Sequence, residues 1–373
     1  MFGDILMLMQ ILKDVAVVSG ISTLLAVVLI IAQKYLSDYG ICKINLNKKR
    51  DVSVEGGSSL LNSLAEEQIF LPSACGGRGS CGTCKCKVNS GGGPLLPTEK
   101  PFLSKTELAD NVRLACQVKV KSDMEINVPE SIFNIRRFQA KVHEIIDYTY
   151  DIKGITLKLV SPDTIDFQAG QFVQIESQAY AKIKQKVVRA YSISSKPQDN
   201  DRIQLIIRLV PEGICTTWIH KYLEEGSDVT FTGPYGDFYI RDTEADIIFV
   251  AGGSGKAPMK SMLEDLQVKG TTRKMTYFFG ARTAKDLYLT DEMRSFEQVF
   301  SDFKYEPVLS KPAPEDKWKG KTGFVMPYFQ DAIRDPKNTE AYLCGSPGMI
   351  NAVKKSLIAM GVPDDKIYYD SFG

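Results

Sequence analysis

A short glycine-rich stretch, LPSACGGRGSCGTCKC, limits what this chain can fold into more than any other feature. It brings Cys75, Cys81, Cys84 and Cys86 close together, and Cys116 follows later in the chain. A disulfide-built scaffold is excluded, because such secreted scaffolds are small and cysteine-dense, whereas this chain has 8 cysteines in 373 residues. A structural zinc site favours two tight C-x2-C pairs, and the stretch contains only one.

The spacing favours an iron-sulfur cluster instead. Cys75, Cys81 and Cys84 form C-x5-C-x2-C, which is similar to the plant-type ferredoxin loop C-x4-C-x2-C with one residue inserted. The glycines permit the backbone angles with which a loop can turn its amide groups toward cluster sulfurs. We therefore predict a [2Fe-2S] cluster and leave Cys86 outside its ligand set, as a strand residue. The predicted ligands are Cys75, Cys81, Cys84 and Cys116.

The N-terminus carries an uncharged apolar run over residues 15–32, with a further apolar stretch upstream. About 20 apolar residues suffice to cross a bilayer, and no small-residue cleavage site follows. An uncleaved anchor over 1–36 is therefore predicted, rather than a signal peptide or a buried helix. Lys13 precedes the run, and five basic residues follow it, which by the positive-inside rule places the rest of the chain in the cytoplasm. These five are Lys34, Lys43, Lys48, Lys49 and Arg50.

Composition excludes several classes of function. With 46 Lys and Arg against 45 Asp and Glu, the chain is nearly neutral, so no phosphate-neutralising surface for nucleic acid is indicated. The 2 histidines, His143 and His220, stand in no ligand-like or triad-like spacing. This argues against a zinc enzyme of the HExxH type and against a Ser-His-Asp hydrolase.

Residues 37–130 are expected to form a small α+β, ferredoxin-like domain around the cysteine loop. Apolar residues alternate with polar ones at Cys42, Ile44 and Leu46, which predicts a half-buried strand. A helical stretch at 58–67 precedes the loop. Apolar residues predict two more strands after it, one through Leu114, Val118 and Val120 and the other through Met124, Ile126 and Val128.

The remainder of the chain changes character at about residue 241. Between 131 and 240, short strands separated by Pro, Gly and Asp favour an antiparallel β-barrel, with Ile203, Leu205, Ile207 and Leu209 on one face of a strand. From 241 to 373, apolar strands such as IIFVA, YFFGA and AYLCG alternate with helices. That alternation predicts an α/β, doubly wound parallel sheet, so the whole chain is expected to be multidomain.

The β-rich segment carries a candidate flavin site. RAYSISS contains Arg189, Tyr191 and Ser192, the turn PEGICTT contains Gly213 and Thr216, and GPYGDF closes the segment. Together these motifs resemble the ferredoxin-NADP reductase superfamily, in which an R-x-Y-S motif binds FAD. The resemblance implies that Arg189 anchors the flavin phosphate, Tyr191 lies against the isoalloxazine and Ser192 hydrogen-bonds near its reactive edge. It also implies that Gly213 and Thr216 cradle the pyrophosphate, with Thr in place of the usual Ser.

A second glycine turn, GGSGKAP, directly follows the strand IIFVA. A Walker A loop is excluded, because Val250 stands at its first glycine position and Ala257 follows the lysine. What remains is G-x-G-x-x-P at Gly253, Gly255 and Pro258, on a strand-to-helix turn whose amide groups suit an anionic pyrophosphate. The turn resembles the pyridine-nucleotide loop of the same superfamily, and NADH rather than NADPH is what the family implies.

Two further motifs, YLCGSPGM and YYDSFG, lie near the C-terminus. The first resembles the superfamily's second nucleotide motif, which implies that Cys344 and Gly345 lie near the nicotinamide. In the second, Phe372 matches a C-terminal aromatic residue that commonly covers the flavin face that nicotinamide must reach. The resemblance thus makes Tyr191, Ser192, Cys344 and Phe372 the predicted catalytic residues.

The order of the parts indicates an electron relay. NADH gives up two electrons together as hydride, and a cluster accepts only one, so a flavin between them is needed to split the pair. Anchor, cluster domain, flavin barrel and nucleotide domain in this order resemble the F subunits of the sodium-translocating NADH:quinone oxidoreductases. The resemblance implies a single-pass protein of the bacterial inner membrane. It also implies integral-membrane subunits as partners and quinone as the final acceptor.

Two alternatives stay open at the level of sequence. RLVPEG is closer to reductases that serve aromatic or alkane oxygenases, which favours a membrane-tethered, NADH-dependent reductase for another acceptor. The other alternative is a cluster-bearing sensor or scaffold without turnover, against which the intact Arg189, Tyr191, Gly253 and Gly255 argue. Anaerobic bleaching of the flavin by NADH separates both enzymes from the scaffold.

Overall fold

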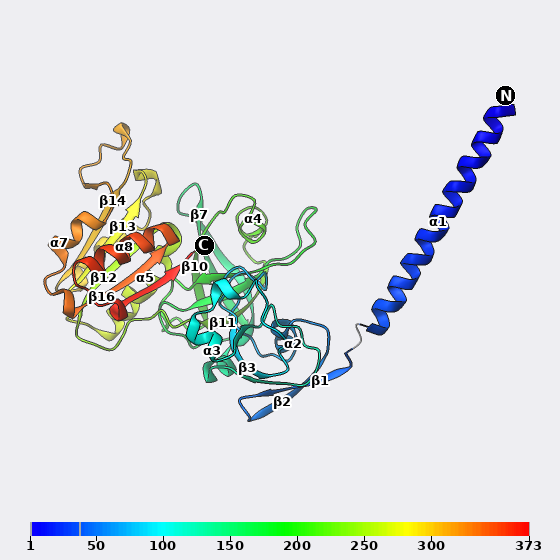
Figure 1. The fold of residues 1–373 in the computed structure, drawn as a ribbon. Coiled ribbons are helices and arrows are strands. Elements are labelled where there is room, and N and C mark those ends of the chain that lie inside the picture. The colour runs from blue at the N-terminus through cyan, green and yellow to red at the C-terminus, as the bar shows by residue number, and fades with distance from the viewer. Residues whose placement is uncertain (1, 37–38, 373) are drawn as a thin grey trace. The chain divides into compact units, whose positions relative to one another are not determined.

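A computed structural model describes residues 2–36 and 39–372 and divides the chain into two compact units. The first unit is Met1–Leu71 with Gly77–Ile132, and the second is Pro72–Gly76 with Phe133–Gly373. Along the chain, an apolar helix, an α+β domain, an antiparallel barrel and a parallel sheet follow one another (Figure 1). The predicted multidomain fold class is confirmed.

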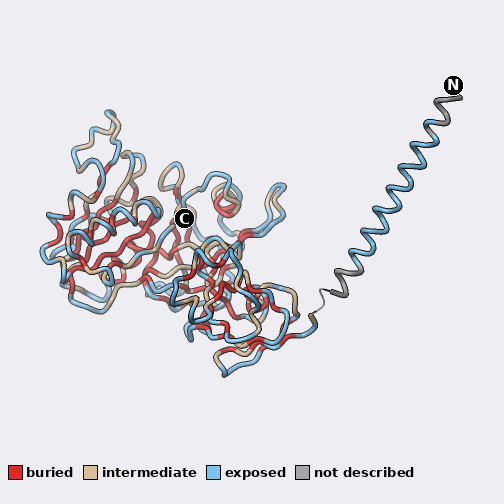
Figure 2. The backbone as a smooth tube through the Cα atoms, in the orientation of Figure 1, coloured by how far each residue is buried: buried red, intermediate tan, exposed pale blue. Residues whose placement is uncertain are grey.

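The first unit begins with α1 (Phe2–Leu36), a single helix. Its segment Met9–Ile30 has a mean hydropathy of 1.9 and is long and apolar enough to cross a membrane, and no part of it is buried. Figure 2 shows this helix exposed wherever its burial is described, whereas the folded domains that follow it contain buried stretches of chain. Lys13 and Asp14 do not break the helix, so it is longer than the apolar run over 15–32.

The cluster domain of the first unit is a five-stranded sheet with two short helices. β1 is parallel to β5, and the other neighbouring pairs are antiparallel. α2 (Leu60–Glu66) begins after Ser59, whose side chain accepts a hydrogen bond from Asn62 N, and α3 (Lys105–Ala109) begins with a capping box. The strand order is β2 (Arg50–Glu55), β1 (Ile41–Leu46), β5 (Met124–Asn127), β3 (Lys85–Ser90) and β4 (Val112–Leu114).

The predicted strand from Leu114 to Val120 is wrong. β4 ends at Leu114, and the chain then turns, because Gln117 N and Val118 N both donate to Leu114 O at 2.8 and 3.2 Å. Val118 and Val120 are buried as expected, but they reach the core from a turn and an isolated bridge. Leu60 N donates to Val118 O at 2.8 Å and Val120 N donates to Ser58 O at 3.0 Å, so the two valines flank an isolated antiparallel bridge and do not continue β4. The turn is also the element that carries Cys116.

The second unit contains an antiparallel barrel. All of its neighbouring strands are antiparallel, and a bridge between Ile193 and Leu205 connects the β9 end of the sheet to β10. Ile203, Leu205 and Ile207 are fully buried on one face of β10, as their alternation predicts, and α4 (Ile214–Lys221) contributes to the same core. The strand order is β10 (Arg202–Arg208), β7 (Ile152–Ser161), β6 (Arg136–Asp147), β11 (Asp228–Tyr235), β8 (Phe172–Glu176) and β9 (Val188–Ser192).

The rest of the second unit is a parallel sheet with helices on both faces. One core cluster contains residues of α5 (Lys256–Lys269) and α6 (Thr290–Val299), and another contains residues of α7 (Phe329–Ala332) and α8 (Pro347–Ala359). All neighbouring strands are parallel. Their order is β15 (Lys321–Thr322), β14 (Phe303–Leu309), β13 (Met275–Ala281), β12 (Asp246–Gly252), β16 (Thr339–Gly345) and β17 (Ile367–Ser371).

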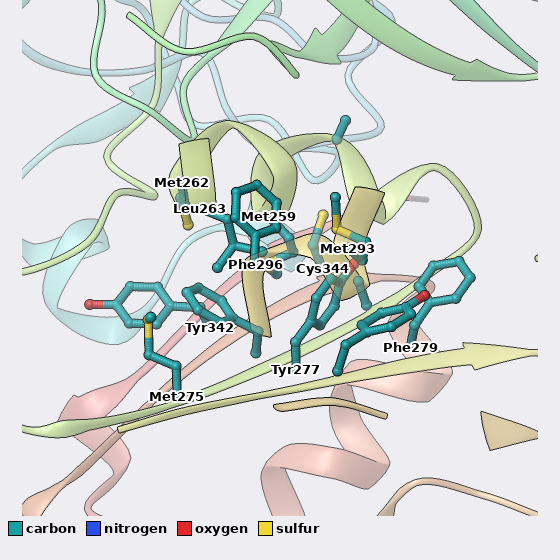
Figure 3. Packing of buried hydrophobic residues seen from close by; sticks show 14 of the residues in the cluster. Met259, Met262, Leu263, Met275, Tyr277, Phe279, Met293, Phe296, Tyr342 and Cys344 are labelled. Atoms are coloured by element: carbon teal, nitrogen blue, oxygen red, sulfur yellow. The ribbon is translucent and has the colours of Figure 1, made fainter. Parts of the chain in front are cut away.

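The strand order reverses between β12 and β16, and this fixes where a ligand can bind. From β12 the chain progresses outward to β13, β14 and β15, whereas β16 and β17 lie on the other side. In open parallel sheets, ligands bind outside the carboxyl ends of the strands at such a reversal. In the core between α5 and the sheet, Met259 and Leu263 of α5 pack in one cluster with Tyr277 of β13 and Tyr342 of β16 (Figure 3).

Candidate functional site

Three of the predicted cluster ligands lie in the first unit. Cys84 directly precedes β3, Cys116 lies in the turn after β4, and a hydrogen bond from Ala115 N to Cys84 O of 2.8 Å joins the two segments. The pKa of the Cys84 thiol is raised far above its ordinary value by its hydrogen bond with Cys116, by burial, and by the charges of Cys116 and Cys81. Each of these thiols makes it harder for its neighbour to lose a proton. A bound metal ion stabilises the deprotonated thiolates and removes this cost.

The loop around these thiols requires glycine at two positions. Gly79 and Gly82 adopt φ of +72° and +69°, and a Cβ would lie 2.4 Å from Gln117 Nε2 at the first position and 2.8 Å from Phe102 Cβ at the second. Gln117 Nε2 also donates to Cys116 Sγ at 3.8 Å. In the described part of the chain, no three His, Cys, Asp or Glu side chains already stand at metal-ligating distances. The thiol chemistry and the hydrogen bond to sulfur nevertheless fit a [2Fe-2S] cluster.

The fourth predicted ligand, Cys75, belongs to the segment Pro72–Gly76, which groups with the second unit. Its carbonyl oxygen accepts a hydrogen bond of 2.9 Å from Arg189 Nη1 on β9. Gly76 adopts φ of +67°, and a Cβ at that position would lie 2.8 Å from Val188 O. Arg189, the predicted phosphate anchor, therefore also holds the backbone of a predicted cluster ligand.

β9 also carries the other two residues of the R-x-Y-S motif, Tyr191 and Ser192. Burial raises the pKa of Tyr191 well above its ordinary value, and the nearby Cys215 adds to this shift. The buried Tyr191 hydroxyl has no nitrogen or oxygen partner among the described residues and only the Cys215 thiol, a weak hydrogen-bonding group, beside it. Because an unsatisfied buried hydroxyl costs about 1–3 kcal/mol, a polar group of a bound ligand would stabilise it. This weakly partnered hydroxyl is the structural feature that fits a bound FAD.

The turn before α4 is held closed by Thr216. Its Oγ1 accepts a hydrogen bond from Val210 N at 3.2 Å and donates to Val210 O at 3.3 Å. Gly213 caps the helix, and a Cβ there would lie 2.6 Å from Thr216 Oγ1. The hydroxyl is what closes the turn, so Thr serves at this position as Ser would. The first amide groups of α4 stay available for an anion.

The nucleotide turn joins β12 to α5. Gly253 adopts φ of +57°, whereas Gly255 is needed for space: a Cβ there would lie 2.3 Å from Cys344 O and 3.2 Å from Gly345 N. Pro258 lies in the first turn of α5, where its missing N–H breaks no helical hydrogen bond. The structure thus brings the G-x-G-x-x-P residues to the carboxyl end of β12, next to the end of β16.

A cavity of about 620 Å³ opens beside this turn. Pockets of this size accommodate a nucleotide-sized ligand. Two bonds order the cavity wall. Within the barrel, Arg208 Nε donates to Asp151 Oδ2 at 2.7 Å, and Tyr150 Oη donates to Asp286 Oδ1, beyond β13, at 2.9 Å. Of the predicted site residues, Gly253 lines the cavity. Its other lining residues include Arg208, Arg282, Phe324, Ser346 and Met349.

The C-terminal strand brings several predicted residues together. β17 pairs with β16 so that Asp370 stands beside Cys344, and Phe372 N donates to Gly345 O at 2.9 Å. Ser192 Oγ donates to Asp370 Oδ2 at 3.3 Å. The Phe372 side chain packs, partly buried, on the core cluster that contains Cys344. Ser192, Cys344, Gly345 and Phe372 therefore gather around one carboxylate.

Asp370 is a candidate functional residue that the sequence did not reveal. Burial raises the pKa of Asp370 to about 6, although the hydrogen bond from Ser192 acts in the opposite direction and lowers it. Burial, followed by the charge of Asp370, also raises the pKa of Cys344 well above its ordinary value. The only sequence signal was the position of Asp370 inside YYDSFG. A partly buried carboxylate that accepts a hydrogen bond from the serine of the flavin motif suits a positioning role.

Lys256 was also not singled out from the sequence. It is fully buried directly after the nucleotide turn, and its Nζ donates to Tyr288 O at 2.7 Å and to Tyr305 Oη at 2.9 Å. Nζ also lies 3.9 Å from the centroid of the Phe279 ring. Tyr288 Oη in turn donates to Gly253 O at 2.8 Å. Lys256 thus supports the turn through Tyr288, and burial lowers its pKa to about 7.

We expect Lys256→Met to stabilise the protein at neutral pH. The folded pKa is about 7 and the ordinary value is 10.5, so the unfolded chain binds more protons between these values. The free energy of unfolding of the unchanged protein therefore rises with pH across this window and is lowest below it. Methionine removes this dependence, and the net gain near neutral pH is about 1–3 kcal/mol after two hydrogen bonds are lost.

Denaturant unfolding of both proteins below, within and above the window measures the effect of Lys256→Met. The expected result is a flatter pH dependence for the variant. Equal slopes in the two proteins would contradict a buried lysine that titrates in this range.

Three family models match the chain in the order of its parts. The 2Fe-2S iron-sulfur cluster binding domain matches residues 44–121, the oxidoreductase FAD-binding domain residues 139–240, and the oxidoreductase NAD-binding domain residues 249–355. The first range contains all four predicted cluster cysteines. The second contains the flavin motif, and the third contains both nucleotide motifs.

Curated relatives match over nearly the full length. The F subunit of the Na(+)-translocating NADH-quinone reductase of Neisseria meningitidis serogroup C / serotype 2a is 34% identical over 405 aligned residues, which cover 98% of this chain and 100% of the relative. The corresponding F subunit of Marinomonas sp. is 33% identical over 405 residues, covering 98% of this chain and 99% of the relative.

Solved structures of reductases share the fold. The Amycolatopsis cytochrome P450 reductase GcoB superimposes with a TM-score of 0.72 and 26% identity, covering 89% of this chain and 98% of that one. The ferredoxin reductase in carbazole 1,9a-dioxygenase gives a TM-score of 0.69 and 25% identity, covering 90% and 99%.

Proposed function

The chain belongs to the family of the F subunits of Na(+)-translocating NADH-quinone reductases, and we propose from this how its parts perform the family's reaction. It is a membrane-associated oxidoreductase that takes hydride from NADH onto FAD and passes single electrons to a [2Fe-2S] cluster. The observation that carries this function is the presence of all three cofactor domains, in order, in one chain. The flavin supplies the conversion of an electron pair into single electrons.

The proposed domains are an anchor at 1–36, a cluster domain at 37–130, a flavin barrel at 131–240 and a nucleotide domain at 241–373. This division is supported by the change from an exposed apolar helix to a mixed sheet, then to an antiparallel sheet and a parallel one. Each proposed domain thereby contains the motif of one cofactor, or the anchor.

The proposed flavin residues lie on the barrel. Arg189 holds the flavin phosphate, Tyr191 lies against the isoalloxazine and Ser192 bonds near its reactive edge. Gly213 and Thr216 form the pyrophosphate turn. The weakly partnered Tyr191 hydroxyl and the closed turn at Thr216 support these roles.

The proposed nucleotide residues lie at the reversal of the parallel sheet. Gly253, Gly255 and Pro258 present the amide groups of the α5 N-terminus to the NADH pyrophosphate. Cys344 and Gly345 lie near the nicotinamide, and Phe372 covers the flavin until the nicotinamide displaces it. The cavity beside Gly253 and the bond from Phe372 N to Gly345 O support this arrangement.

The proposed ligands of the [2Fe-2S] cluster are Cys75, Cys81, Cys84 and Cys116. The hydrogen bond between the Cys84 and Cys116 thiols supports two of them directly. The cysteine spacing and the glycines of the loop support the full set.

We further propose that α1 crosses the bacterial inner membrane once and leaves the cofactor domains in the cytoplasm. The apolar segment Met9–Ile30 and the basic residues that follow it support this orientation. As in the complex that names the family, the electrons leave the cluster for integral-membrane partner subunits and end on quinone.

A reductase for an oxygenase is the second candidate, favoured by the likeness in fold to GcoB and to the carbazole dioxygenase reductase. The two functions differ in the acceptor. Electron delivery to quinone in membranes that contain the partner subunits supports the first, and delivery only to a soluble oxygenase component supports the second.

The proposed function is tested on detergent-purified, full-length protein under anaerobic conditions. Iron, acid-labile sulfide and FAD are quantified per chain, and NADH is then added while flavin absorbance is recorded. We expect all three constituents and rapid bleaching of the flavin. Colourless protein without iron or FAD, or flavin that NADH leaves oxidised, would contradict the proposal.

We expect the rate of flavin reduction to fall as the pH drops through about 6, the pKa to which burial raises Asp370. Protonation removes the carboxylate that accepts from Ser192, and the serine loses its orientation. Asp370→Asn should lower kcat about 10- to 100-fold and remove this limb of the pH profile. A limb that persists in Asp370→Asn would assign the titration to another group.

Phe372→Ala should change nucleotide access and leave the cluster intact. The backbone bond to Gly345 survives the substitution, but the ring that nicotinamide must displace is gone. Because the variant needs no free energy to displace the ring, it should bind NAD+ about tenfold more tightly, equivalent to about 1.4 kcal/mol. Isothermal titration measures the affinity, Phe372→Tyr is the control, and equal affinity of all three proteins would remove the shielding role.

A further inference from the structure

Tyr39 is the first described residue after α1, and its side chain is seated firmly on the cluster domain. Lys119 Nζ and Lys121 Nζ lie 5.4 and 5.9 Å from the centroid of its ring. A Cβ at Gly56 would lie only 2.5 Å from Tyr39 Cβ, so the aromatic residue packs where only glycine fits. Gly56 N also donates to Gly40 O at 2.8 Å. The point at which the chain enters the domain is therefore fixed to the domain.

The chain between α1 and this point is short. Leu36 ends α1, and two residues separate it from Tyr39. Three Cα–Cα steps span at most about 11 Å. The helix from Ile30, where the apolar segment ends, to Leu36 adds about 9 Å. Whatever the orientation of the domain, Tyr39 lies within about 20 Å of the edge of the hydrocarbon core. The headgroup layer fills about 5–8 Å of that distance.

The side chains around Tyr39 suit a membrane interface. Ile41 is 68% exposed, an unusual position for a large aliphatic side chain, and Lys43 is exposed two residues further along β1. Lys119 and Lys121 are exposed as well. We call Tyr39, Ile41, Lys43, Lys119 and Lys121 the Tyr39 surface.

Carboxylates also lie near the Tyr39 surface. Glu55 stands opposite Ile41 in the sheet, and Asp123 accepts a hydrogen bond of 2.8 Å from Lys43 N. Three lysines against two carboxylates leave a modest positive charge, and the lysines are long enough to reach outward from the surface. An aromatic ring, an exposed aliphatic residue and lysines are the combination that binds anionic bilayer surfaces.

We propose that the Tyr39 surface rests on the anionic phospholipid headgroups of the membrane leaflet at which α1 ends. Lys43, Lys119 and Lys121 face lipid phosphates, and Ile41 enters the headgroup layer. The cluster domain is then held at the bilayer by direct contact in addition to its tether, which narrows the region that it explores. The inference rests on the proposed anchor, because the short connection places lipid within reach only if α1 spans the membrane.

The test uses full-length, cofactor-loaded protein in lipid nanodiscs, without any other subunit. One set of discs contains only phosphatidylcholine, and the other also contains phosphatidylglycerol. A membrane-impermeant amine reagent labels lysines, and mass spectrometry measures the labelling rates of Lys43, Lys119 and Lys121. Lys317 and Lys319, exposed in the second unit, serve as internal references.

At about 1 kcal/mol for each lysine near an anionic surface, we expect labelling of Lys119 and Lys121 to slow about 5- to 30-fold in the anionic discs. The protection should disappear at about 1 M salt, where the Debye length falls to about 3 Å. In the variant Lys119→Gln/Lys121→Gln, Lys43 should lose its protection. In the matched control Lys317→Gln/Lys319→Gln, Lys43 should keep it.

Equal labelling in both lipids would overturn the proposal, as would protection that salt does not relieve. Protection that arises only after membrane partner subunits are added would assign the surface to a protein instead. Protein that does not co-migrate with the discs would overturn the anchor together with the inference. Flavin bleaching by NADH, recorded on the same discs, reports the proposed redox function independently of both.

Discussion

Replacing Cys84 by serine yields a protein whose flavin NADH still reduces but in which no electron reaches a cluster. Cys84 is 1% exposed and interacts with both Cys116 and Cys81, so it is the most central of the three thiols in the first unit. Serine preserves the approximate size of the side chain, but it has no sulfur and cannot supply the soft thiolate ligand that an iron-sulfur cluster requires. Iron content and the electron paramagnetic resonance signal of the cluster should be lost.

The matched control for Cys84→Ser is Cys86→Ser, two residues further along. Cys86 lies in β3, is 4% exposed, and has a pKa that burial raises to about 12. It stands outside the predicted ligand set, so its variant should retain iron and the cluster signal. Loss of the cluster in Cys86→Ser together with its retention in Cys84→Ser would reverse the ligand assignment.

Replacing Gly255 by alanine should cost the protein most of its affinity for NADH. The new Cβ would stand 2.3 Å from Cys344 O, and a backbone oxygen inside the parallel sheet cannot yield cheaply. The start of α5 must therefore move away from β16, and the amide groups offered to the pyrophosphate move with it. Strain of about 1–3 kcal/mol and a roughly 100-fold weaker binding of NADH are expected.

Gly280→Ala is the stability control for Gly255→Ala, because it adds the same methyl group at the carboxyl end of the adjacent strand. Gly280 itself lines the cavity, so this control compares unfolding and not affinity. A Cβ at Gly280 would meet Val325 Cγ1 at 3.8 Å and Ala251 O at 3.9 Å, which are ordinary contacts. Denaturant unfolding of both variants measures the strain, and NADH titration of Gly255→Ala against the unchanged protein measures the loss of affinity. Wild-type affinity and stability in Gly255→Ala would show that close packing at this turn is not needed.

Elements of the fold were predictable where the pattern of apolar residues along a strand matches the pattern of its buried faces. Ile203, Leu205 and Ile207 alternate because one face of β10 is buried, and IIFVA is apolar throughout because β12 is covered on both faces. The single strand predicted from Leu114 to Val120 failed because a turn interrupts it: Leu114 ends β4, whereas Val118 and Val120 flank a separate bridge.

The site was predictable where a motif is local. The cysteine loop, RAYS and the glycine turn are read from short stretches, whereas Asp370 and Lys256 depend on contacts between distant segments. The functional interpretation of Asp370 depends on its hydrogen bond with Ser192, 178 positions earlier in the chain. Lys256 follows a loop of apparent phosphate-binding type, and only the structure shows that its ammonium points to Tyr288 and Tyr305 instead. A surface lysine and a buried one look the same in sequence.

The central claim is that one chain converts an electron pair from NADH into single electrons on its own cluster. The most direct test is anaerobic mixing with NADH, followed in parallel by flavin absorbance and by rapid-freeze electron paramagnetic resonance of the cluster. The account predicts that flavin reduction comes first, that the cluster signal follows from the same molecules, and that FAD-depleted protein gives no cluster signal. A cluster reduced before the flavin, or equally fast without FAD, would contradict it.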